Sequence, residues 1–499
     1  MTTLHNAPGD PAPPERLRPA ALLALAGALI LAGCATRPAP PAVSAPVPLQ
    51  WQAALPHQGS LTDLSQWWQL QGDPLLAELV AAAQAVSPTV AASRSRIEQA
   101  RAARTAAGAA LLPALDASAS LSRGRAQQAA AGGSVPVVTT AQAGLQAAWE
   151  IDLAGGSRAS QEAAAQRLLG ADAQWHSARV SVAAETASLY IGLRSCRELA
   201  RVTQRDADSR QETARLSALS TQAGFTAPGT DALARASAAE ARGRSIRQSA
   251  QCALDLKGLV ALSGLAEAEL KEKLAVPLAE DVQPAMFSIS ALPAEILAQR
   301  PDVFSAGREV AAASADIGSA EAARYPRLGL GGSIGAASLR AGGATVSLDT
   351  WTIGPLALSL PLFDGGRRAA NVEAARARYA EAAALYRASV RQAVREVEEA
   401  LVNLQSSTAR QGDAEAAVDG YRAAFTGTEA LYQGGLASLP QLEDARRSLL
   451  AAQIGRVALQ QERKSAGVAL YRALGGGWTP ALAPLDAAVA GLPAAAASQ

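Results

Sequence analysis

Two stretches of the chain alternate apolar with polar residues and then reach a pair of glycines. The first alternates over 145–153 and the second over 356–362. Alternation is the period of a strand with one apolar face, and glycine relieves the steric limits on a sharp bend. A long Ala-, Glu- and Arg-rich stretch without proline follows each pair. We therefore predict corners from strand to very long helix at Gly155, Gly156, Gly365 and Gly366.

The two corners belong to two copies of one pattern. Gly365 follows Gly155 at an offset of 210 residues, and Pro326 follows Pro113 at an offset of 213. Each copy reads as a helix, two alternating strands, a long helix, a Gly-containing tip and a returning helix. The predicted fold class is mainly α, internally duplicated, with long coiled-coil-like helical hairpins and four strands per chain.

The first copy begins with a predicted helix over about 75–110, in which Pro88 marks a reset. Its long helix covers 156–222, with Gly170 as a candidate break, and its returning helix covers 231–262. At 1.5 Å per residue the long helix extends on the order of 100 Å. No compact domain needs such a helix.

The second copy repeats this order after Arg300, with a long helix from Gly366 to a tip at Gly434 and Gly435 and a return over 439–474. The long helices of both copies carry apolar residues at steps of three and four, the spacing of a coiled-coil seam. The seam positions are Leu189, Leu193, Cys196 and Ala200 in the first copy, and Val390, Val394, Val397, Leu401 and Leu404 in the second.

The predicted strands cover about 115–121, 145–153, 328–339 and 346–362, each with an apolar and a polar face. They fit half of a soluble sheet, or a membrane barrel with lipid outside and water inside. Four strands cannot close a barrel, since the smallest membrane barrels have about eight. The barrel interpretation therefore requires an oligomer.

The N-terminus has the pattern of an export signal. Two arginines precede an apolar run over 20–32. Leu-Ala-Gly-Cys over 31–34, at the end of this region, is similar to a bacterial lipoprotein signal. We expect Cys34 to become the lipidated first residue of the mature chain. The alternative is an ordinary secretory signal that contains a cysteine. Ala35 rather than Asp follows, which by resemblance to bacterial sorting rules indicates the outer membrane.

The other two cysteines lie symmetrically about the first tip, because Cys196 is 28 residues before Gly224 and Cys252 is 28 residues after it. An antiparallel hairpin that turns near Gly224 places them side by side. Disulfides persist in oxidising compartments such as the periplasm. We predict a disulfide between them, with two buried free thiols as the alternative and a catalytic thiol as the less favoured one.

Composition and motifs argue against an enzyme. Only His57 and His176 follow Cys34, far apart and without ligand-spaced companions, and there is no CxxC, phosphate-binding glycine loop or nucleophile elbow. We expect no cofactor and no metal. The formal net charge of +1, spread along helices, gives no basis for nucleic-acid binding.

Several motifs together resemble the TolC-type outer membrane factors, specifically the lipidated NodT-like branch that serves multidrug efflux. They are the Cys-containing signal at Cys34, AETASLYIGLR over 184–194, RPDV over 300–303, ADIGSA over 315–320 leading to Tyr325-Pro326, and LFDGG over 362–366. The resemblance implies a homotrimer with a 12-stranded barrel in the outer membrane and a helical tunnel in the periplasm.

The same resemblance implies the partners and the function. The expected partners are a periplasmic adaptor and an inner-membrane pump, which in this branch is of the RND type. The channel would passively conduct small molecules such as drugs to the exterior. The alternative within the channel interpretation is the outer membrane duct of a type I protein secretion system. A coiled-coil scaffold without a channel leaves the paired alternating strands beside a lipid anchor unexplained.

In this family the tunnel closes at the hairpin tips through hydrogen bonds and acidic rings. By alignment on the second tip, Tyr432 takes the place of the gate tyrosine and Asp444 of one ring acid, and Asp231 is an acidic candidate on the first tip. Gln441 replaces a second acid, and Ala437 replaces the gate arginine. The latch is thus only partly kept, and the closed state is expected to be held differently.

Each gate residue also has a structural explanation. Asp444 and Asp231 near helix N-termini are favourable to the helix dipole in any protein, and Tyr432 can pack between helices. The predicted organisation is a signal peptide over 1–33, an anchor and Pro-rich tether over 34–74, a first repeat over 75–276, a linker over 277–293, a second repeat over 294–475 and a tail over 476–499.

Overall fold

A computed structural model describes residues 43–48, 51–53, 68, 72–125, 137–276, 297 and 300–478. The chain divides into two compact units. The described part of one unit lies within 104–164 and 312–379, and that of the other within 43–103, 165–311 and 380–478. The predicted signal, Cys34 and the predicted linker at 277–293 lie outside the described residues.

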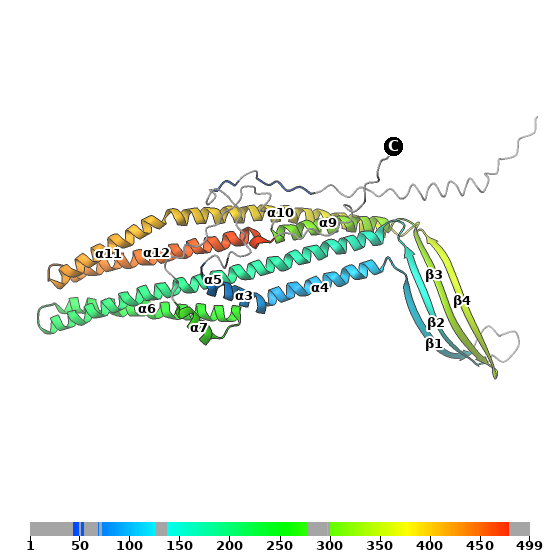
Figure 1. Ribbon diagram of the computed structural model, residues 1–499, viewed down its shortest axis with the longest axis horizontal. Helices are drawn as coiled ribbons and strands as arrows, with labels where there is room; N and C mark the ends of the chain where they lie inside the picture. The colour runs from blue at the N-terminus through cyan, green and yellow to red at the C-terminus, as the bar shows by residue number, and fades with distance from the viewer. Residues whose placement is uncertain are drawn as a thin grey trace, which may run out of the picture. The chain divides into compact units, whose positions relative to one another are not determined.

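The first unit contains a sheet of four antiparallel strands in the order β1-β2-β3-β4 (Figure 1). β1, β2 and β3 are longer than the alternating stretches predicted, whereas β4 ends at Ser359 and the predicted strand residues Leu360 and Leu362 lie beyond it. For example, β2 begins eight residues before Leu145, because the β-branched run over 137–140 extends it. The strands are β1 Ala114–Arg125, β2 Val137–Ile151, β3 Arg327–Ala341 and β4 Ala344–Ser359.

The strand register gives the sheet one apolar and one polar face. Leu145 lies opposite Ala117 on β1 and Ile334 on β3, and Ile334 lies opposite Trp351 on β4. The next row along has the opposite character, with Asp116, Gln146, Ser333 and Thr352 aligned across the four strands. Since residues alternate between faces along a strand, the two rows face opposite sides.

A β-bulge preserves this separation where Pro355 interrupts β4. Leu330 pairs with Leu356 and Gly332 pairs with Ile353, so β4 contains one extra residue at this point. Pro355 lies inside the bulge, and Pro361 follows the end of β4. The extra residue keeps Ile353 and Leu356 on the same apolar face despite their odd spacing.

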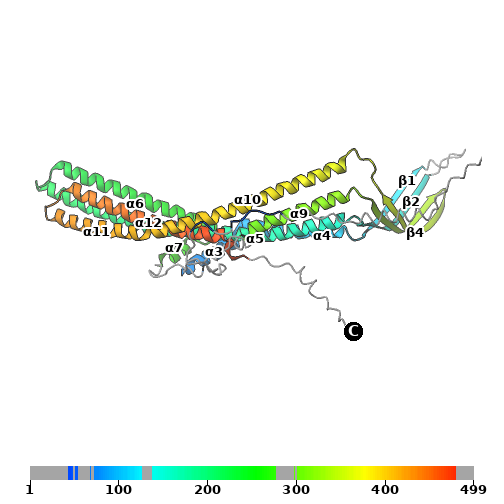
Figure 2. The ribbon, with the colours of Figure 1, turned by 90° about the horizontal axis from the view of Figure 1, so that it is seen from above.

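The second unit is built from long helices that pair antiparallel (Figures 1 and 2). One hairpin is formed by α5 and α6, and the other by α11 and α12, which follow α10. Parts of four helices, α4, α5, α9 and α10, belong to the first unit. The helices are α3 Pro74–Val86, α4 Pro88–Ala109, α5 Gly156–Gln222, α6 Pro228–Ser263, α7 Glu267–Ala275, α9 Pro301–Ala322, α10 Arg367–Ala409, α11 Gln411–Gln433 and α12 Leu439–Ala473, with the short 3-10 turn η4 Gly475–Gly477.

The largest apolar core of the second unit joins α3, α5, α6, α7, α10 and α12. Its fully buried leucines include Leu79, Leu193, Leu259, Leu270 and Leu401, each at most 2% exposed. Leu193 and Leu401 are two of the predicted seam residues, so the steps of three and four mark the buried stripes of both long helices.

Two helix predictions need correction. The helix after Gly366 is not continuous to the second tip, because it breaks at Arg410 between α10 and α11. Ser407 and Thr408 hydrogen-bond back to main-chain carbonyls at 2.8 Å and 2.7 Å, which bends helices. Gly170, by contrast, does not break the 67-residue α5. A side chain there would contact Ser305 Oγ at 3.4 Å, so the glycine permits close approach of α9.

The reset expected near Pro88 is present, because α3 and α4 meet there at an angle of 51°. No single helix among the described residues is long and apolar enough to cross a membrane, whereas this bent pair passes by length and composition. The apolar residues of α3 that give the pair its hydropathy, Leu75, Leu76, Leu79 and Val80, are buried in the helical core.

Candidate functional site at the hairpin tips

The first tip turns between α5 and α6 through a left-handed glycine. Gly224 has a φ of +83°, a conformation that side-chain-bearing residues rarely adopt. The N–H of Phe225 donates to the carbonyl of Ser220 at 2.9 Å and closes the end of α5. Pro228 then starts α6, and Asp231 lies in its first turn.

The second tip also turns through a left-handed glycine, but its returning helix begins with a capping box. Gly435 has a φ of +75°, and the N–H of Leu436 donates to the carbonyl of Leu431 at 2.8 Å. A capping box starts α12, in which the N–H of Ser438 donates to Gln441 Oε1 at 2.7 Å. Gln441, which stands where the resemblance has an acid, therefore caps the helix.

The structure places the three predicted gate residues in different environments. The Asp444 side chain is 77% exposed and lies 3.6 Å from Arg447. The Asp231 side chain is only 13% exposed and pairs with Arg235 at 3.0 Å. Tyr432 is half-buried against an apolar cluster from both hairpins, made of Ala214, Ala234, Ala238, Phe425, Leu439 and Leu442. Among the described residues, no bond joins the three to one another.

A group of buried charges, which sequence reasoning missed, connects the two hairpins beside this apolar cluster. Arg210 on α5 pairs with Asp206 at 2.9 Å and also binds Glu443 on α12. Glu443 in turn pairs with Arg446 at 2.7 Å. All four side chains are at most 10% exposed. We call Asp206, Arg210, Glu443 and Arg446 the inter-hairpin charge cluster.

Hydroxyl groups add hydrogen bonds to the inter-hairpin charge cluster, although the buried Nε of Arg446 has no partner among the described residues. Ser237 on α6 accepts from Arg210 at 2.6 Å and donates to Glu443 at 2.8 Å. Arg446 donates to Ser209 at 3.0 Å and to Thr213 at 3.1 Å, both on α5. Burial lowers the pKa of Arg446, while Glu443 acts in the opposite direction. Arginine nevertheless stays protonated in proteins, so the cluster contains real charges.

The sequence did contain a signal for the inter-hairpin charge cluster. The seam of α5, continued from Ala200 at steps of three and four, reaches Thr203, Ala207, Arg210, Ala214 and Ser217. Those five residues are all buried. A charged residue at a seam position predicts a buried partner, because an isolated buried charge is too costly.

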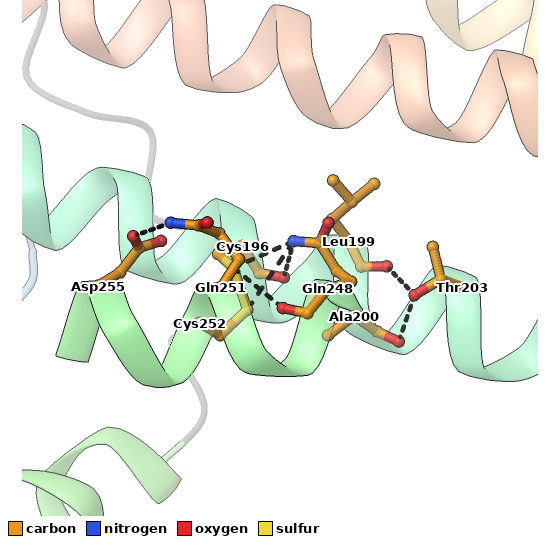
Figure 3. The surroundings of a disulfide bond; sticks show 8 residues. All are labelled: Cys196, Leu199, Ala200, Thr203, Gln248, Gln251, Cys252 and Asp255. Carbon is orange, nitrogen blue, oxygen red and sulfur yellow. Dashed lines mark hydrogen bonds between the residues drawn. A yellow bond between two sulfur atoms is a disulfide. The ribbon is translucent and has the colours of Figure 1, made fainter. Parts of the chain in front are cut away.

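The two cysteines on the first hairpin are joined by a disulfide between α5 and α6 (Figure 3). The Cα atoms of Cys196 and Cys252 are 5.5 Å apart, within the range that disulfides require. The side-chain amide nitrogen of Gln248, one turn before Cys252, lies 3.1 Å from Cys196 Sγ. The structure thus brings together the pair that the symmetric spacing predicted.

The corner glycines lie where strands meet long helices, and two aspartates organise them. Gly155, Gly365 and Gly366 have φ values of +77°, +64° and +87°. Gly156 allows Ala322 to approach closely, since a Cβ at position 156 would lie 3.0 Å from Ala322 Cβ. Asp152 accepts the backbone N–H groups of Ser157 and Arg158 at 3.2 Å and 3.0 Å. Asp364 likewise accepts from Gly366 and Arg368 at 3.0 Å and 3.2 Å.

These carboxylates occupy the positive ends of the two long helices. Burial raises the pKa of Asp152, but the N–H donors of Arg158 and Ser157 outweigh it and hold the pKa below its ordinary value. The backbone N–H groups at the start of each long helix are therefore hydrogen-bonded by a carboxylate of the same corner, Asp152 or Asp364. No group of His, Cys, Asp or Glu in the described residues has the arrangement of a metal site.

Comparisons with known proteins decide the family. Residues 79–265 and 292–476 match the outer membrane efflux protein family. This chain belongs to the outer membrane efflux protein family. It is 32% identical over 458 residues to the pyoverdine export outer membrane protein OpmQ of Pseudomonas putida, covering 90% of this chain and 96% of OpmQ. It is 31% identical over 464 residues to the outer membrane protein OprJ of Pseudomonas aeruginosa, covering 91% of this chain and 95% of OprJ.

Among solved structures, the outer-membrane channel OprN superposes with a TM-score of 0.77 at 27% identity, covering 89% of this chain and 99% of OprN. The resemblance to the TolC-type family, the mainly helical fold with four antiparallel strands and the outer membrane location are thereby confirmed. This efflux protein is a channel component rather than a member of an enzyme family. Efflux is favoured over protein secretion.

Two motifs that carried the resemblance hold the helical unit of this efflux protein together. Arg300, 6% exposed at its side chain, binds Asp302 at 2.6 Å, Glu396 at 2.8 Å and the carbonyl of Ala473 at 3.0 Å. It thereby joins α9, α10 and the end of α12. In the first repeat Tyr190 donates to Asp73 at 2.5 Å.

Proposed function

We propose that three copies of this efflux protein form one passive exit duct, with a barrel of twelve strands in the outer membrane and a helical tunnel in the periplasm. The observation that carries the proposal is the sheet itself. It has four long strands, two edges and one apolar face, and both edge strands are exposed along nearly their whole length.

Pairing with strands of other copies would give the two edge strands the hydrogen-bond partners that they lack in the single sheet. β1 and β4 each have one side without a strand partner in the described sheet, and an open edge is not tolerated in lipid because its N–H and C=O groups lack partners. Pairing of β4 in one copy with β1 in the next gives a closed ring. One or two copies would supply at most about eight strands, the size of the smallest barrels, which leave no aqueous channel.

The face pattern indicates which side meets lipid. The row that contains Leu145, Ile334 and Trp351 is apolar, and those side chains are 42%, 61% and 72% exposed in the single chain. The row that contains Gln146, Ser333 and Thr352 is polar. An apolar exterior and a polar interior are the pattern of outer membrane barrels.

Lipid at Cys34 would add a second attachment to the same membrane, and the anchor rests on the sequence pattern alone. The described part of the tether is held by the helices, because Glu398 on α10 accepts the backbone N–H groups of Gln52 and Ala53 at 2.7 Å and 2.8 Å.

The proposed partners are a periplasmic adaptor and an inner-membrane pump of the RND type. The name of one relative specifies pyoverdine export, which is consistent with a cargo of small molecules, although an exit duct is generally less selective than its pump. We propose that Tyr432, Asp444 and Asp231 contribute to closure where the hairpin tips converge in the trimer.

A crosslinked pull-down from membranes, with a tagged chain that retains Cys34, tests the proposal. Trimers recovered with an adaptor and a proton-driven pump are the expected result. Recovery with an ATP-driven exporter would instead support secretion, and recovery of monomers alone would contradict the barrel. Mass spectrometry of the N-terminal peptide, with and without Cys34→Ser, checks lipidation in the same preparation.

A further inference from the structure

One row of the sheet carries two arginines on the face that we assign to lipid. Arg123 on β1 lies opposite Thr139 on β2, which in turn lies opposite Arg340 on β3. Arg340 lies opposite Thr345 on β4. Each of these residues is six positions along its strand from the apolar row that contains Leu145, so both rows lie on the same face. We call Arg123, Thr139, Arg340 and Thr345 the arginine row.

The arginine row lies at the depth of the lipid headgroups. The row of Leu145 is six positions from the arginine row in one direction and six positions from the row of Ile151 and Leu328 in the other. At about 3.3 Å per residue and a strand tilt of about 40°, six positions correspond to about 15 Å of depth. This depth is half of a hydrocarbon core about 30 Å thick. With Leu145 near the midplane, the two arginines therefore lie where the hydrocarbon ends.

The arginine row belongs to the outer leaflet of the membrane. At their other ends the strands lead into the helices, since α5 begins at Gly156 shortly after β2 and α10 begins at Arg367 shortly after β4. With the helices in the periplasm, the ends that carry the arginine row face the exterior. The main lipid of the outer leaflet is lipopolysaccharide, whose lipid A anchor is a glycolipid with phosphate groups at the headgroup level.

The guanidinium groups of the arginine row are accessible to an anion. Arg123 and Arg340 are both exposed, and no ion pair joins either of them to a carboxylate among the described residues. Arg340 Nε donates to the hydroxyl of Thr345 at 3.3 Å, which orients the side chain along the row. Asp349, an acid on the same face, is four positions from Thr345, about 13 Å along β4.

The charges at this end of the sheet lie on the outer face alone. Arg125, two positions beyond Arg123 on β1, also points outward. The two rows that flank the arginine row point to the inner face and contain no charged residue. They are Ser122, Thr140, Leu339 and Val346 in one row, and Gly124, Val138, Ala341 and Ala344 in the other. Arginines that acted on ions inside the pore would point inward, whereas these arginines point toward lipid.

The spacing of the two arginines suits a lipid with phosphate groups. One strand separates Arg123 from Arg340, so their Cα atoms are about 10 Å apart, and two such long side chains can converge over Thr139. A guanidinium group binds phosphate oxygens in a bidentate manner, and the hydroxyl of Thr139 can add a further donor. The same face continues inward through Leu121 to Leu145, both exposed in the single chain, and offers an apolar surface to acyl chains.

We propose that the arginine row is a binding site for the phosphate groups of lipid A on the outer surface of the barrel. Arg123 and Arg340 bind the phosphate oxygens, Thr139 donates to the same group, and the acyl chains lie along the apolar face. The proposal rests on the proposed channel function, because the assignments of the lipid face and of the outer leaflet both follow from it.

Native mass spectrometry of the purified full-length trimer, titrated with lipid A in detergent, tests the site. Lipid A with both phosphates is compared with dephosphorylated lipid A, which has the same acyl chains, and with phosphatidylglycerol, an anionic phospholipid. The unmodified trimer should bind lipid A at least about tenfold more tightly than either of the other two lipids, since loss of one hydrogen bond to a charged group corresponds to this factor or more.

A double variant and a matched control identify the residues responsible. Arg123→Gln combined with Arg340→Gln should weaken binding of lipid A at least about tenfold and leave binding of the dephosphorylated form unchanged. Arg327→Gln is the control, because Arg327 is also on β3 but points to the inner face at the opposite end of the sheet. Its affinity for lipid A should equal that of the unmodified trimer.

The outcomes separate the lipid site from the channel itself. Equal binding of lipid A by the double variant and the unmodified trimer would overturn the site, and so would an equal loss in Arg327→Gln. Equal affinity for phosphatidylglycerol would overturn the assignment to lipid A. If the double variant does not form trimers, Arg123→Gln and Arg340→Gln are judged singly by the same criterion. An unmodified protein recovered only as monomers would instead contradict the proposed function.

Discussion

Leu145 on β2 lies directly opposite Ile334 on β3, on the apolar face of the sheet. Both side chains are exposed in the single chain, at 42% and 61%. Their immediate neighbours along the strands, Gln146 and Ser333, form a polar pair on the other face. A membrane barrel gives both pairs their expected surroundings, with lipid against the leucine and isoleucine and water against the polar pair.

Leu145→Arg is therefore expected to destabilise the barrel strongly. A cationic side chain on the lipid face costs about 2–4 kcal/mol near the bilayer midplane, and each assembled trimer would carry the change three times. The yield of heat-resistant trimers in outer membranes measures the effect. Gln146→Arg, one residue along the same strand, is the matched control and should leave trimer yield close to normal. Equal loss in both variants would contradict the assignment of faces.

The strands show what sequence alone predicts well and where it stops. Alternation identified all four strands and both faces, because burial against one environment imposes a period of two. It placed Leu145 on the correct face without any structure. It did not predict which strands pair or where the bulge lies, since the pairing of Ile353 with Gly332 depends on how β4 accommodates Pro355.

The helical unit shows the complementary limit. The steps of three and four predicted buried Leu193 and Leu401, because they measure the period of the helix. They did not predict that Arg210 would face Glu443, which is 233 residues away in the sequence. That contact depends on the tertiary approach of two hairpins, and local spacing does not encode it. The capping of α12 by Gln441, which the structure shows, was also not predicted from the sequence.

Removal of the disulfide is expected to destabilise the first hairpin. Cys196 and Cys252 are 56 residues apart in the sequence, and closing a loop of this size restricts the unfolded chain by about 4 kcal/mol in the chain-entropy account. Cys196→Ser with Cys252→Ser should lower the melting temperature of the α5/α6 hairpin under oxidising conditions. Hydrogen exchange at amides of 197–251 locates the change.

A reducing agent is the internal control for that measurement. It should bring the unmodified protein close to the double variant and leave the double variant unchanged. The hairpin of α11 and α12 contains no cysteine, so its exchange rates should change little. A melting temperature of the unmodified protein that does not respond to a reductant able to reach the bond would indicate free thiols at these positions.

The Arg300 network predicts a pH dependence of stability. Burial raises the pKa of Asp302, but the hydrogen bonds and charge of Arg300 outweigh it and keep this pKa below its ordinary value. A carboxylate whose folded-state pKa is depressed adds stability above the unfolded value of about 3.9, and the addition disappears as pH falls through the folded value. Asp302→Asn should therefore cost about 1–2 kcal/mol at pH 7 and almost nothing near the folded pKa and below.

Urea unfolding of the assembled protein at a series of pH values measures this difference. The expected loss of stability in Asp302→Asn is small because the Asp302 side chain is 41% exposed and because Arg300 keeps its ion pair with Glu396. Glu309→Gln on the same helix is the control, since its pair with Arg167 is about half exposed on both sides and should contribute at most about 1 kcal/mol. A constant difference between Asp302→Asn and the unmodified protein across the whole range would contradict the assignment.

Asp444 provides the last prediction, which concerns ions at the tunnel mouth. In a trimer its three copies would form a ring of carboxylates, and a narrow mouth focuses their negative field. The nearby Arg447 is 3.6 Å away and 74% exposed, so it compensates that field only weakly. Asp444→Ala should lower cation selectivity and change closed-state conductance in bilayers at low salt. The difference should shrink toward 1 M salt, where the screening length falls to about 3 Å. Conductance and selectivity equal to those of the unmodified protein at every salt concentration would remove Asp444 from the gate and leave it as a charge at the start of α12.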